Sequence, residues 1–194
     1  MLSADLSQLR NLIFAIHPLQ DAEWNAFSSA WTTFEAKRKT ILTAAGETER
    51  YLYFVTSGVQ RAYYLHGDKD ATIMFSYPYS FSGVADSFLL QKPSPYYLET
   101  LTQSTFLRTT FNQVNELMQR YHNFETLIRK AISITLAGTL ERQVELQAFS
   151  AEEKFRTLLK RSPHVLQQIP HKYLASYLGI DATTFSKLLG SVRI

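Results

Sequence analysis

The sequence predicts an α+β fold in which helices precede and follow a central all-β segment. Between Thr40 and Phe111, short runs rich in aromatic and β-branched residues follow one another, separated by Gly and Pro. Such runs are typical of an antiparallel sandwich or barrel. On both sides of this segment, apolar residues recur at helical spacing. Hydrophobic residues make up 45% of the 194-residue chain, which is enough to form a sizeable core.

Two helices are predicted before the β segment, over residues 6–16 and 21–34. We expect Asp21 to be the N-cap of the second. The apolar residues that define the pattern are Leu6, Leu9, Ile13 and Ile16 in the first helix, and Trp24, Phe27, Trp31 and Phe34 in the second.

The β segment itself divides into six candidate strands. Gly67 and Asp68 stand between two of them and predict a hairpin turn. The six runs are TILTAA, RYLYFVTS, VQRAYYL, ATIMFSY, YYLETL and TFLRTTF.

The helical period returns at Asn112, with one helix over 112–121 and a long one from Phe124 to about Leu146. The long helix is apolar on more than one side, so it needs two partners. One partner would be the β segment, and the other would be the same helix of a second subunit, with burial inside one chain as the alternative. The residues expected at this dimer interface are Phe124, Leu127, Ala131, Ile134 and Gly138.

The last quarter of the chain is predicted to form short helices over 152–161, 163–168, 171–178 and 182–189, and it is basic. Residues 151–194 carry a net charge of +4, whereas residues 1–150 carry −1. A basic end indicates a polyanion partner, although a solvated helical surface is the alternative. The seven cations are Lys154, Arg156, Lys160, Arg161, Lys172, Lys187 and Arg193.

The stretch His171–Gly190, HKYLASYLGIDATTFSKLLG, meets the demands of a helix-turn-helix. Ala175 is small where the two helices meet, Gly179 permits the turn, and Asp181 can cap the second helix. Apolar residues at Leu174, Leu178, Ile180, Phe185 and Leu188 are spaced to fill the angle between the helices. An ordinary helical hairpin is the alternative. The candidate DNA contacts are His171, Lys172, Thr183, Thr184, Ser186 and Lys187.

Several classes of protein are disfavoured. The chain has no cysteine, and His66 is the one histidine in the β segment, so we expect neither a metal site nor an enzyme. The motifs G-x-S-x-G, G-x-x-x-x-G-K-[ST] and H-E-x-x-H are absent. Neither a signal peptide nor a membrane span is expected, so the predicted location is the cytoplasm.

Two stretches resemble regulators of the Crp/Fnr family, of the Bacteroidetes type. ILTAAGETERYLYFVTSGVQRAYY is similar to the start of that family's cyclic-nucleotide-binding β-roll, and EEKFRTLLKRSPHVLQQIPHKYLASYLGIDATTFSKL resembles its C-terminal region. The resemblance implies an eight-stranded, jelly-roll-like β-roll sensor domain, a long dimerisation helix and a winged helix-turn-helix. The corresponding domains are residues 1–122, 123–148 and 149–194.

The same resemblance implies a homodimeric transcription regulator that binds promoter DNA, with RNA polymerase as a further partner. The sequence departs from the family at the ligand site. Gly83 is retained, but Val84 replaces the Glu that binds the ribose, and Pro95 or Tyr96 stands where the phosphate-binding Arg would be. Cyclic AMP is therefore not expected in the family's usual mode, no cofactor is assigned, and any small-molecule effector is unidentified. The candidates to line the effector pocket are Gly83, Val84, Asp86, Tyr96 and Tyr97, with packing and loop roles as the alternative.

The recognition helix departs as well. Residues 182–187 read Ala-Thr-Thr-Phe-Ser-Lys where well-known relatives read Arg-Glu-Thr-Val-Gly-Arg, so the Arg and Glu base contacts are missing. A β-roll signalling or interaction protein that has lost specific DNA binding is the alternative function.

Overall fold

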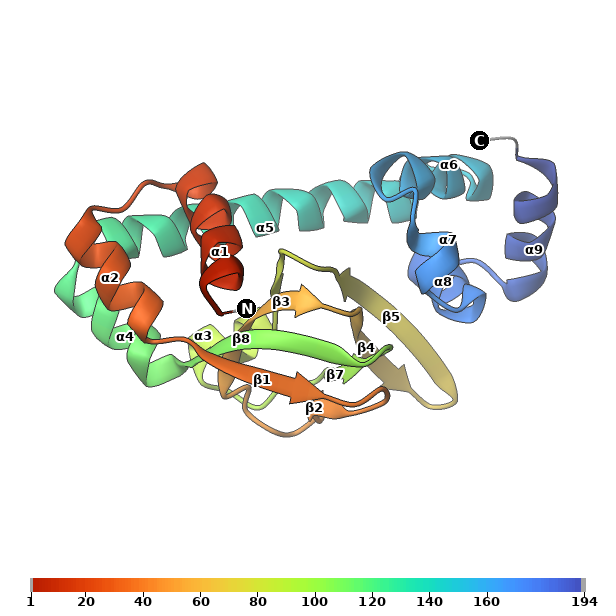
Figure 1. The fold of residues 1–194 in the computed structure, drawn as a ribbon. Coiled ribbons are helices and arrows are strands. Elements are labelled where there is room, and N and C mark those ends of the chain that lie inside the picture. The colour runs from red at the N-terminus through yellow and green to blue at the C-terminus, as the bar shows by residue number, and fades with distance from the viewer. Residues whose placement is uncertain (1, 193–194) are drawn as a thin grey trace. The chain divides into compact units, whose positions relative to one another are not determined.

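The computed structural model describes residues 2–192 and divides by its contacts into two units (Figure 1). The first unit combines Met1–Ala62 with Phe75–Ile134, and the second combines Tyr63–Met74 with Thr135–Ile194. Each unit combines segments that are distant in the sequence, whereas the predicted domains are continuous stretches. The domain boundaries at 122/123 and 148/149 remain a prediction.

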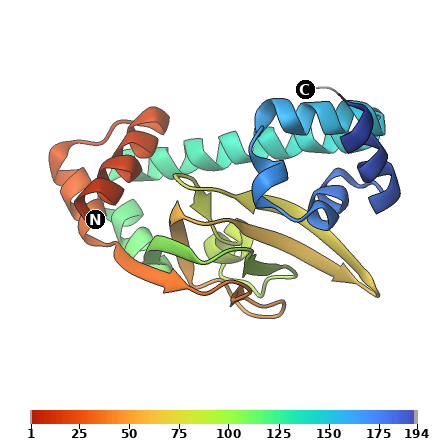
Figure 2. The same cartoon turned by 45° about the vertical axis from the view of Figure 1, so that its right-hand side comes forward.

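Eight strands in the described part of the chain form two four-stranded sheets, as the β-roll prediction requires. The sheet orders are β1-β8-β3-β6 and β2-β7-β4-β5. In the first sheet, β3 pairs antiparallel with β8, and Tyr53 lies opposite Arg108. The strands are β1 Thr32–Ala36, β2 Ile41–Thr43, β3 Tyr51–Ser57, β4 Gln60–His66, β5 Lys69–Ser76, β6 Phe81–Ser82, β7 Tyr97–Thr100 and β8 Ser104–Thr110. The predicted turn at Gly67 joins β4 to β5, a hairpin visible in Figure 2.

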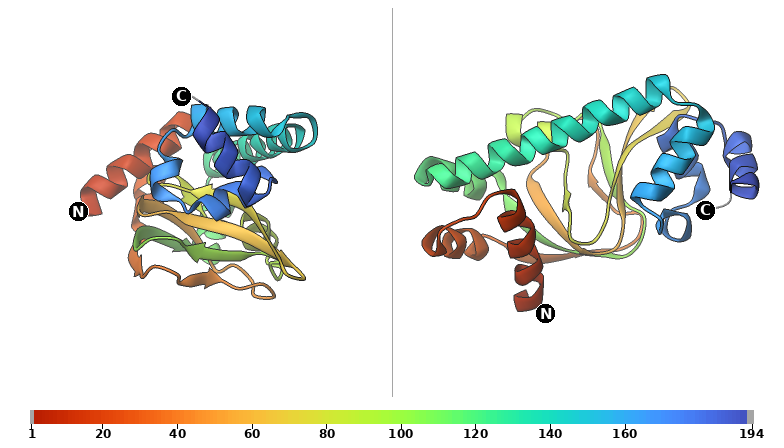
Figure 3. Two further views of the ribbon diagram at one scale, coloured as in Figure 1. Left: turned by 90° about the vertical axis from the view of Figure 1, so that its right-hand side faces the viewer. Right: turned by 90° about the horizontal axis from the view of Figure 1, so that it is seen from above.

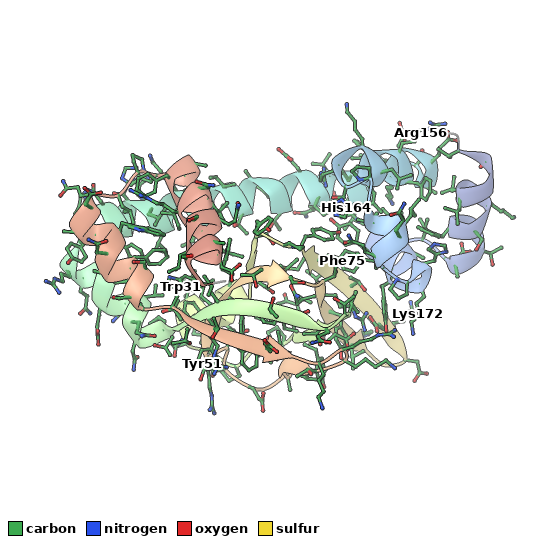
Figure 4. The ribbon with its side chains drawn as sticks, viewed as in Figure 1. Trp31, Tyr51, Phe75, Arg156, His164 and Lys172 are labelled. Atoms are coloured by element: carbon green, nitrogen blue, oxygen red, sulfur yellow. The ribbon has the colours of Figure 1, made fainter. Side chains whose placement is uncertain are left out.

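The helices of the first unit cover one face of the sheet β1-β8-β3-β6. Phe54 and Leu107 project from this face into a core that contains Leu9, Phe27 and Phe124. Because side chains alternate along a strand, their neighbours Tyr53 and Phe106 project to the opposite face. In Figure 4, Trp31 lies on the helix-covered side and Tyr51 on the other. The helices are α1 Leu2–Ile16, α2 Asp21–Ser29, α3 Ala85–Leu90, α4 Phe111–Arg120 and the first half of α5 His122–Ala148.

The second predicted helix ends earlier than its apolar spacing indicated. Helix α2 stops at Ser29, and Phe34 belongs to β1, where it lies opposite Phe106 of β8. Pairing with a strand distant in the sequence overrides the local helical pattern. The N-cap is Gln20 rather than Asp21, and the Glu23 carboxylate accepts a hydrogen bond from the Gln20 backbone N–H at 2.8 Å.

Helix α5 has a buried beginning and an exposed continuation. Phe124 and Leu127 are each 1% exposed and belong to the chain's own core, so they are not available to a second subunit. Farther along the helix, large apolar side chains are about half exposed. They are Ile132, Ile134, Leu136, Leu140 and Val144, with exposed fractions of 45, 60, 57, 53 and 56%. The dimer prediction therefore rests on this later stretch.

The second unit is built around four short helices, which Figure 3 shows grouped together. They are α6 Ala151–Arg161, α7 Val165–Gln168, α8 His171–Leu178 and α9 Ala182–Ser191. Val192 is the one described residue after α9, so the wing implied by the family resemblance stays a prediction. The Ser176 hydroxyl of α8 accepts a hydrogen bond from the Thr72 backbone N–H at 2.9 Å and donates one to the Asp70 carbonyl at 2.7 Å.

A buried carboxylate ties α5 to α6 and α8. Glu145 accepts hydrogen bonds from Arg142, at 2.9 Å, and from Arg161. Arg142 also donates to the Tyr177 carbonyl and lies over the Tyr177 ring. Burial acts to raise the pKa of Glu145, but the two arginines outweigh it and leave that pKa below its usual value.

Candidate functional site

Helices α8 and α9 are joined by the turn that the sequence predicts. Gly179 follows α8 with a φ of 64°, in the left-handed region that favours glycine. The Ile180 backbone N–H then donates to the Ala175 carbonyl at 3.1 Å, which closes the end of the helix. A Cβ at position 179 would lie 3.4 Å from the Leu146 side chain, which is an ordinary contact, so it is the backbone conformation that restricts this position.

Helix α9 begins at a side-chain cap. Asp181 accepts a hydrogen bond from the Thr184 backbone N–H at 2.8 Å, as expected for an N-cap residue. The Asp181 side chain also accepts the Thr184 hydroxyl hydrogen bond. These hydrogen bonds lower the pKa of Asp181 and keep it charged at the helix N-terminus.

The two helices close over a small core of apolar side chains. Leu174 and Leu178 are fully buried, and Phe185 of α9 is 1% exposed. The Phe185 ring lies 5.4 Å from the ring of Phe155 of α6. Of the five predicted packing positions, Leu174, Leu178 and Phe185 are buried, and Ile180 and Leu188 are half-buried.

The predicted DNA contacts differ in their exposure and in whether their side chains already make hydrogen bonds within the protein. His171, Lys172, Thr183, Ser186 and Lys187 are exposed, and Thr184 is half-buried. The Thr184 hydroxyl donates to Asp181, and the Ser186 hydroxyl donates to the Ala182 carbonyl at 2.9 Å. Among the predicted contacts on α9, Thr183 and Lys187 therefore have side chains with no hydrogen bond to the rest of the described residues.

The basic charge of the last quarter is partly compensated. Arg156 pairs with Glu152 at 2.8 Å, and Arg161 pairs with Glu145. Lys172 lies over the Tyr173 ring, with its Nζ 4.7 Å from the ring centroid. Arg193 lies outside the described residues. The remaining positive charge on α8 and α9 is that of Lys172 and Lys187.

The segment predicted to hold an effector surrounds α3. Gly83 has a φ of 134°, and Val84, the N-cap of α3, is 4% exposed. Asp86 is exposed, and Tyr96 and Tyr97 are half-buried.

A buried carboxylate occupies the position beside Val84. The Val84 backbone N–H donates to Glu49 Oε2 at 3.2 Å, and the Thr43 hydroxyl donates to the same oxygen at 2.7 Å. The Tyr51 backbone N–H donates to Oε1 at 3.2 Å. Burial raises the pKa of Glu49, although these hydrogen bonds act in the opposite direction. The approach to Val84 N–H is thus taken by a side chain of the protein itself.

A cavity of about 300 Å³ lies in the first unit, lined by strands of both sheets. None of the five predicted effector residues lines it. Its walls are Phe34, Thr40, Ile41, Leu42, Thr43, Glu47, Thr48, Glu49, Arg50, Tyr51, Tyr53 and Arg108. These residues lie outside the segment that corresponds to the family's ligand site, so the sequence did not single them out. Arg108, a charged residue inside the apolar run TFLRTTF, was the available signal.

Within residues 2–192, no group of three or more His, Asp and Glu side chains is arranged to hold a metal ion. No helix in that range is both long enough and apolar enough to cross a membrane.

Comparison with known proteins identifies the fold. Residues 33–121 match the model of the cyclic nucleotide-binding domain family. No curated protein matches the sequence. FixK2 from Bradyrhizobium japonicum is 16% identical with a TM-score of 0.72, and 82% of this chain and 83% of that chain are covered. The Thermus thermophilus catabolite activator protein is 20% identical with a TM-score of 0.57, covering 92% and 89%.

A third solved structure is that of a putative transcriptional regulator of the Crp/Fnr family from Eubacterium rectale. It is 15% identical with a TM-score of 0.65, and 89% of this chain and 82% of that chain are covered. The Bacteroidetes-type assignment remains a prediction. The fold is therefore that of Crp/Fnr-type regulators, in which a domain similar to the cyclic nucleotide-binding domain is followed by a long helix and a group of short helices.

Proposed function

We propose that the protein is a homodimeric, DNA-binding transcription regulator that reads DNA with α9. The observation that carries this proposal is the α8–Gly179–α9 arrangement, because a buried Phe185 and the Asp181 cap fix the second helix while Thr183 and Lys187 stay exposed. In a helix-turn-helix, the second helix enters the major groove and the start of the first approaches the backbone. Lys172, in the first turn of α8, is the residue suited to a phosphate.

The proposed dimer contacts lie on α5 between Ile132 and Val144. Apolar side chains that are about half exposed on one helix form a surface that a second copy of the helix would cover. Gly138 has open space where its Cβ would be, so a second helix could approach closely there. Ala131 and Ile134 lie at the start of the same stretch. A two-fold dimer would place its DNA half-sites about 10 bp apart or a multiple of that distance.

The proposed effector domain responds to a small molecule, but not to cyclic AMP in the family's usual mode. Glu49 already accepts the Val84 N–H, and no arginine follows in the segment 84–97. RNA polymerase is a further proposed partner once the regulator is on DNA.

Retardation of promoter DNA by the purified protein, measured across a range of salt concentrations, tests the proposal. The DNA is obtained beforehand by selection from a random pool. Lys187→Ala should weaken binding to all sequences about equally and reduce the salt slope by roughly one for each subunit, because a lysine holds a phosphate as a point charge.

If Lys187→Ala instead loses affinity only for sites that carry one particular base, Lys187 contacts that base, and the loss should be about 1–3 kcal/mol for each contact. Lys92→Ala, which removes an exposed lysine far along the chain from α5, α8 and α9, is the control. Unchanged binding by a variant that carries both Lys187→Ala and Thr183→Ala would remove α9 from the interface. The alternative, a β-roll interaction protein without specific DNA binding, would then be favoured.

A further inference from the structure

The cavity in the β-roll has hydrogen-bond donors without acceptors. Arg108 is half-buried, and its guanidinium makes no hydrogen bond or ion pair with the side chains of residues 2–192. Tyr53 is 2% exposed, lines the cavity, and its hydroxyl has no hydrogen-bond partner in that same range. Burial, and next the nearby Glu49 carboxylate, raise the pKa of Tyr53, so the hydroxyl keeps its proton.

The two carboxylates in the same wall already accept hydrogen bonds from the protein itself. Both oxygens of Glu49 accept hydrogen bonds from its own chain, as described above. Glu47 turns back to accept the Ala44 backbone N–H at 3.2 Å. Because buried polar groups are normally hydrogen-bonded, an excess of unmatched donors indicates a ligand that supplies acceptors.

The surroundings of Arg108 hold its guanidinium in one orientation. Its carbon lies 4.1 Å from the centroid of the Phe34 ring and 4.3 Å from that of Tyr51. Stacking on aromatic rings uses the faces of the guanidinium and leaves its in-plane N–H groups for a ligand. A planar carboxylate matches this pair of N–H groups with two parallel hydrogen bonds.

The charge and composition of the wall restrict the ligand further. Glu47 and Glu49 balance Arg50 and Arg108 in formal charge, so a monoanion is tolerated better than a dianionic phosphate. A sugar with several donor hydroxyls would find few free acceptors. Arg108 lies over Phe34 and Tyr51, and Phe106 stacks on Phe34, so apolar contact with a ligand ring would come from the remaining ring surface of Tyr51 and Tyr53. A volume of about 300 Å³ lies at the small end of ligand pockets.

We propose that this cavity binds a small aromatic monocarboxylic acid, whose carboxylate meets the Arg108 guanidinium and the Tyr53 hydroxyl. This inference rests on the proposed function, since the acid would be the effector of the regulator. It replaces the sequence-based pocket around α3 with a site on β1, β3 and β8.

The probes are 2-naphthoate and its neutral counterpart 2-naphthamide, measured by calorimetry and by thermal shift on the full chain without DNA. 2-Naphthoate should bind and raise the melting temperature, and 2-naphthamide should bind at least tenfold more weakly, a difference of about 1.4 kcal/mol. Inorganic phosphate and cyclic AMP are the competing anions and should bind more weakly than 2-naphthoate. Equal binding of acid and amide, tighter binding of either competing anion, or no binding of 2-naphthoate overturns the proposal.

Variants locate the site. Arg108→Gln should weaken 2-naphthoate at least tenfold, and Tyr53→Phe, which keeps the ring, should weaken it by a smaller factor. Arg120→Gln is the matched control, because Arg120 also stacks on an aromatic ring, that of Tyr121, but is an exposed residue of α4 outside the cavity. Unchanged affinity in folded Arg108→Gln overturns the site. If that variant does not fold, the contrast between acid and amide on the natural chain and the effect of Tyr53→Phe decide. Because no DNA is present, failure here leaves the DNA-binding proposal to its own test.

Discussion

Asp181 accepts two hydrogen bonds from Thr184, one from the backbone N–H at 2.8 Å and one from the hydroxyl at 2.6 Å. The first holds the start of α9, and the second uses the one hydroxyl proton that Thr184 has. Thr184 was expected to face DNA together with Thr183. The structure instead engages Thr184 in the cap, so its role at a DNA surface would be indirect.

Asp181→Ala should lower the melting temperature of the protein more than Thr184→Val does. The aspartate variant loses both hydrogen bonds and a negative charge at a helix N-terminus, whereas the valine variant loses only the hydroxyl bond. Thermal unfolding followed by circular dichroism measures both. Equal melting temperatures for the two variants would show that the backbone bond contributes nothing.

Glu145 should make the stability of the protein depend on pH in the acid range. Burial raises its pKa, but the hydrogen bonds from Arg161 and Arg142 leave it below its usual value. The folded-state pKa is thus lower than the unfolded one. The stabilisation is present above the unfolded value of about 4.5 and is lost as the pH falls through the lower folded value.

Glu145→Gln should therefore lose about 1–3 kcal/mol at neutral pH and show a shallower decline of stability below pH 5 than the natural protein. Urea unfolding at a series of pH values gives both quantities. Glu125→Gln is the control, because Glu125 lies on the same helix but is exposed. A decline as steep in Glu145→Gln as in the natural chain would assign the acid sensitivity to other carboxylates.

The protein should be a dimer at micromolar concentration, and Ile134→Glu should make it monomeric. Ile134 is 60% exposed in the single chain, so the new charge would be solvated in the monomer but desolvated in a dimer. Light scattering after gel filtration gives the mass, and Ile134→Val should remain dimeric. A natural chain that is monomeric under these conditions would disprove the dimer.

Cyclic AMP should bind weakly or not at all. Glu49 occupies the Val84 N–H, and a phosphate buried near α3 without a guanidinium partner is unfavourable by about 3–5 kcal/mol. Calorimetry at millimolar nucleotide measures the affinity. A dissociation constant in the low micromolar range or tighter would contradict this prediction.

The elements with strong local signals could be predicted from the sequence. Helix α8 has the predicted bounds, and the turn at Gly67 and the cap at Asp181 lie where the residue types indicate. The errors come from contacts between distant parts of the chain. Phe34 has helical spacing from Trp31 but pairs with β8, more than 70 residues away. The short elements β6 and α3 carry too few residues for a periodic signal.

The two candidate sites also differ in how far their residues could be predicted from the sequence. The helix-turn-helix is one contiguous stretch, so its packing residues could be placed in advance. The cavity combines Glu49, Tyr53 and Arg108 from β8 and the segment around β3, and only the sheet register brings them together. The burial of Phe124 and Leu127 in the chain's own core also depends on α1 and α2, which a helical pattern on α5 alone does not reveal.

The hydrogen bonds of Ser176 have a consequence for how the chain folds as it is synthesised. Ser176 is bonded to Thr72 and Asp70, which precede it by more than 100 residues. At about 5–20 residues per second, the ribosome completes the hairpin roughly 5–20 seconds before the serine that binds it is made. During that interval the β4–β5 turn leaves the ribosome without this partner. The second unit therefore cannot complete these contacts until residue 176 has been made, and chaperones have access to the unpaired hairpin during that interval.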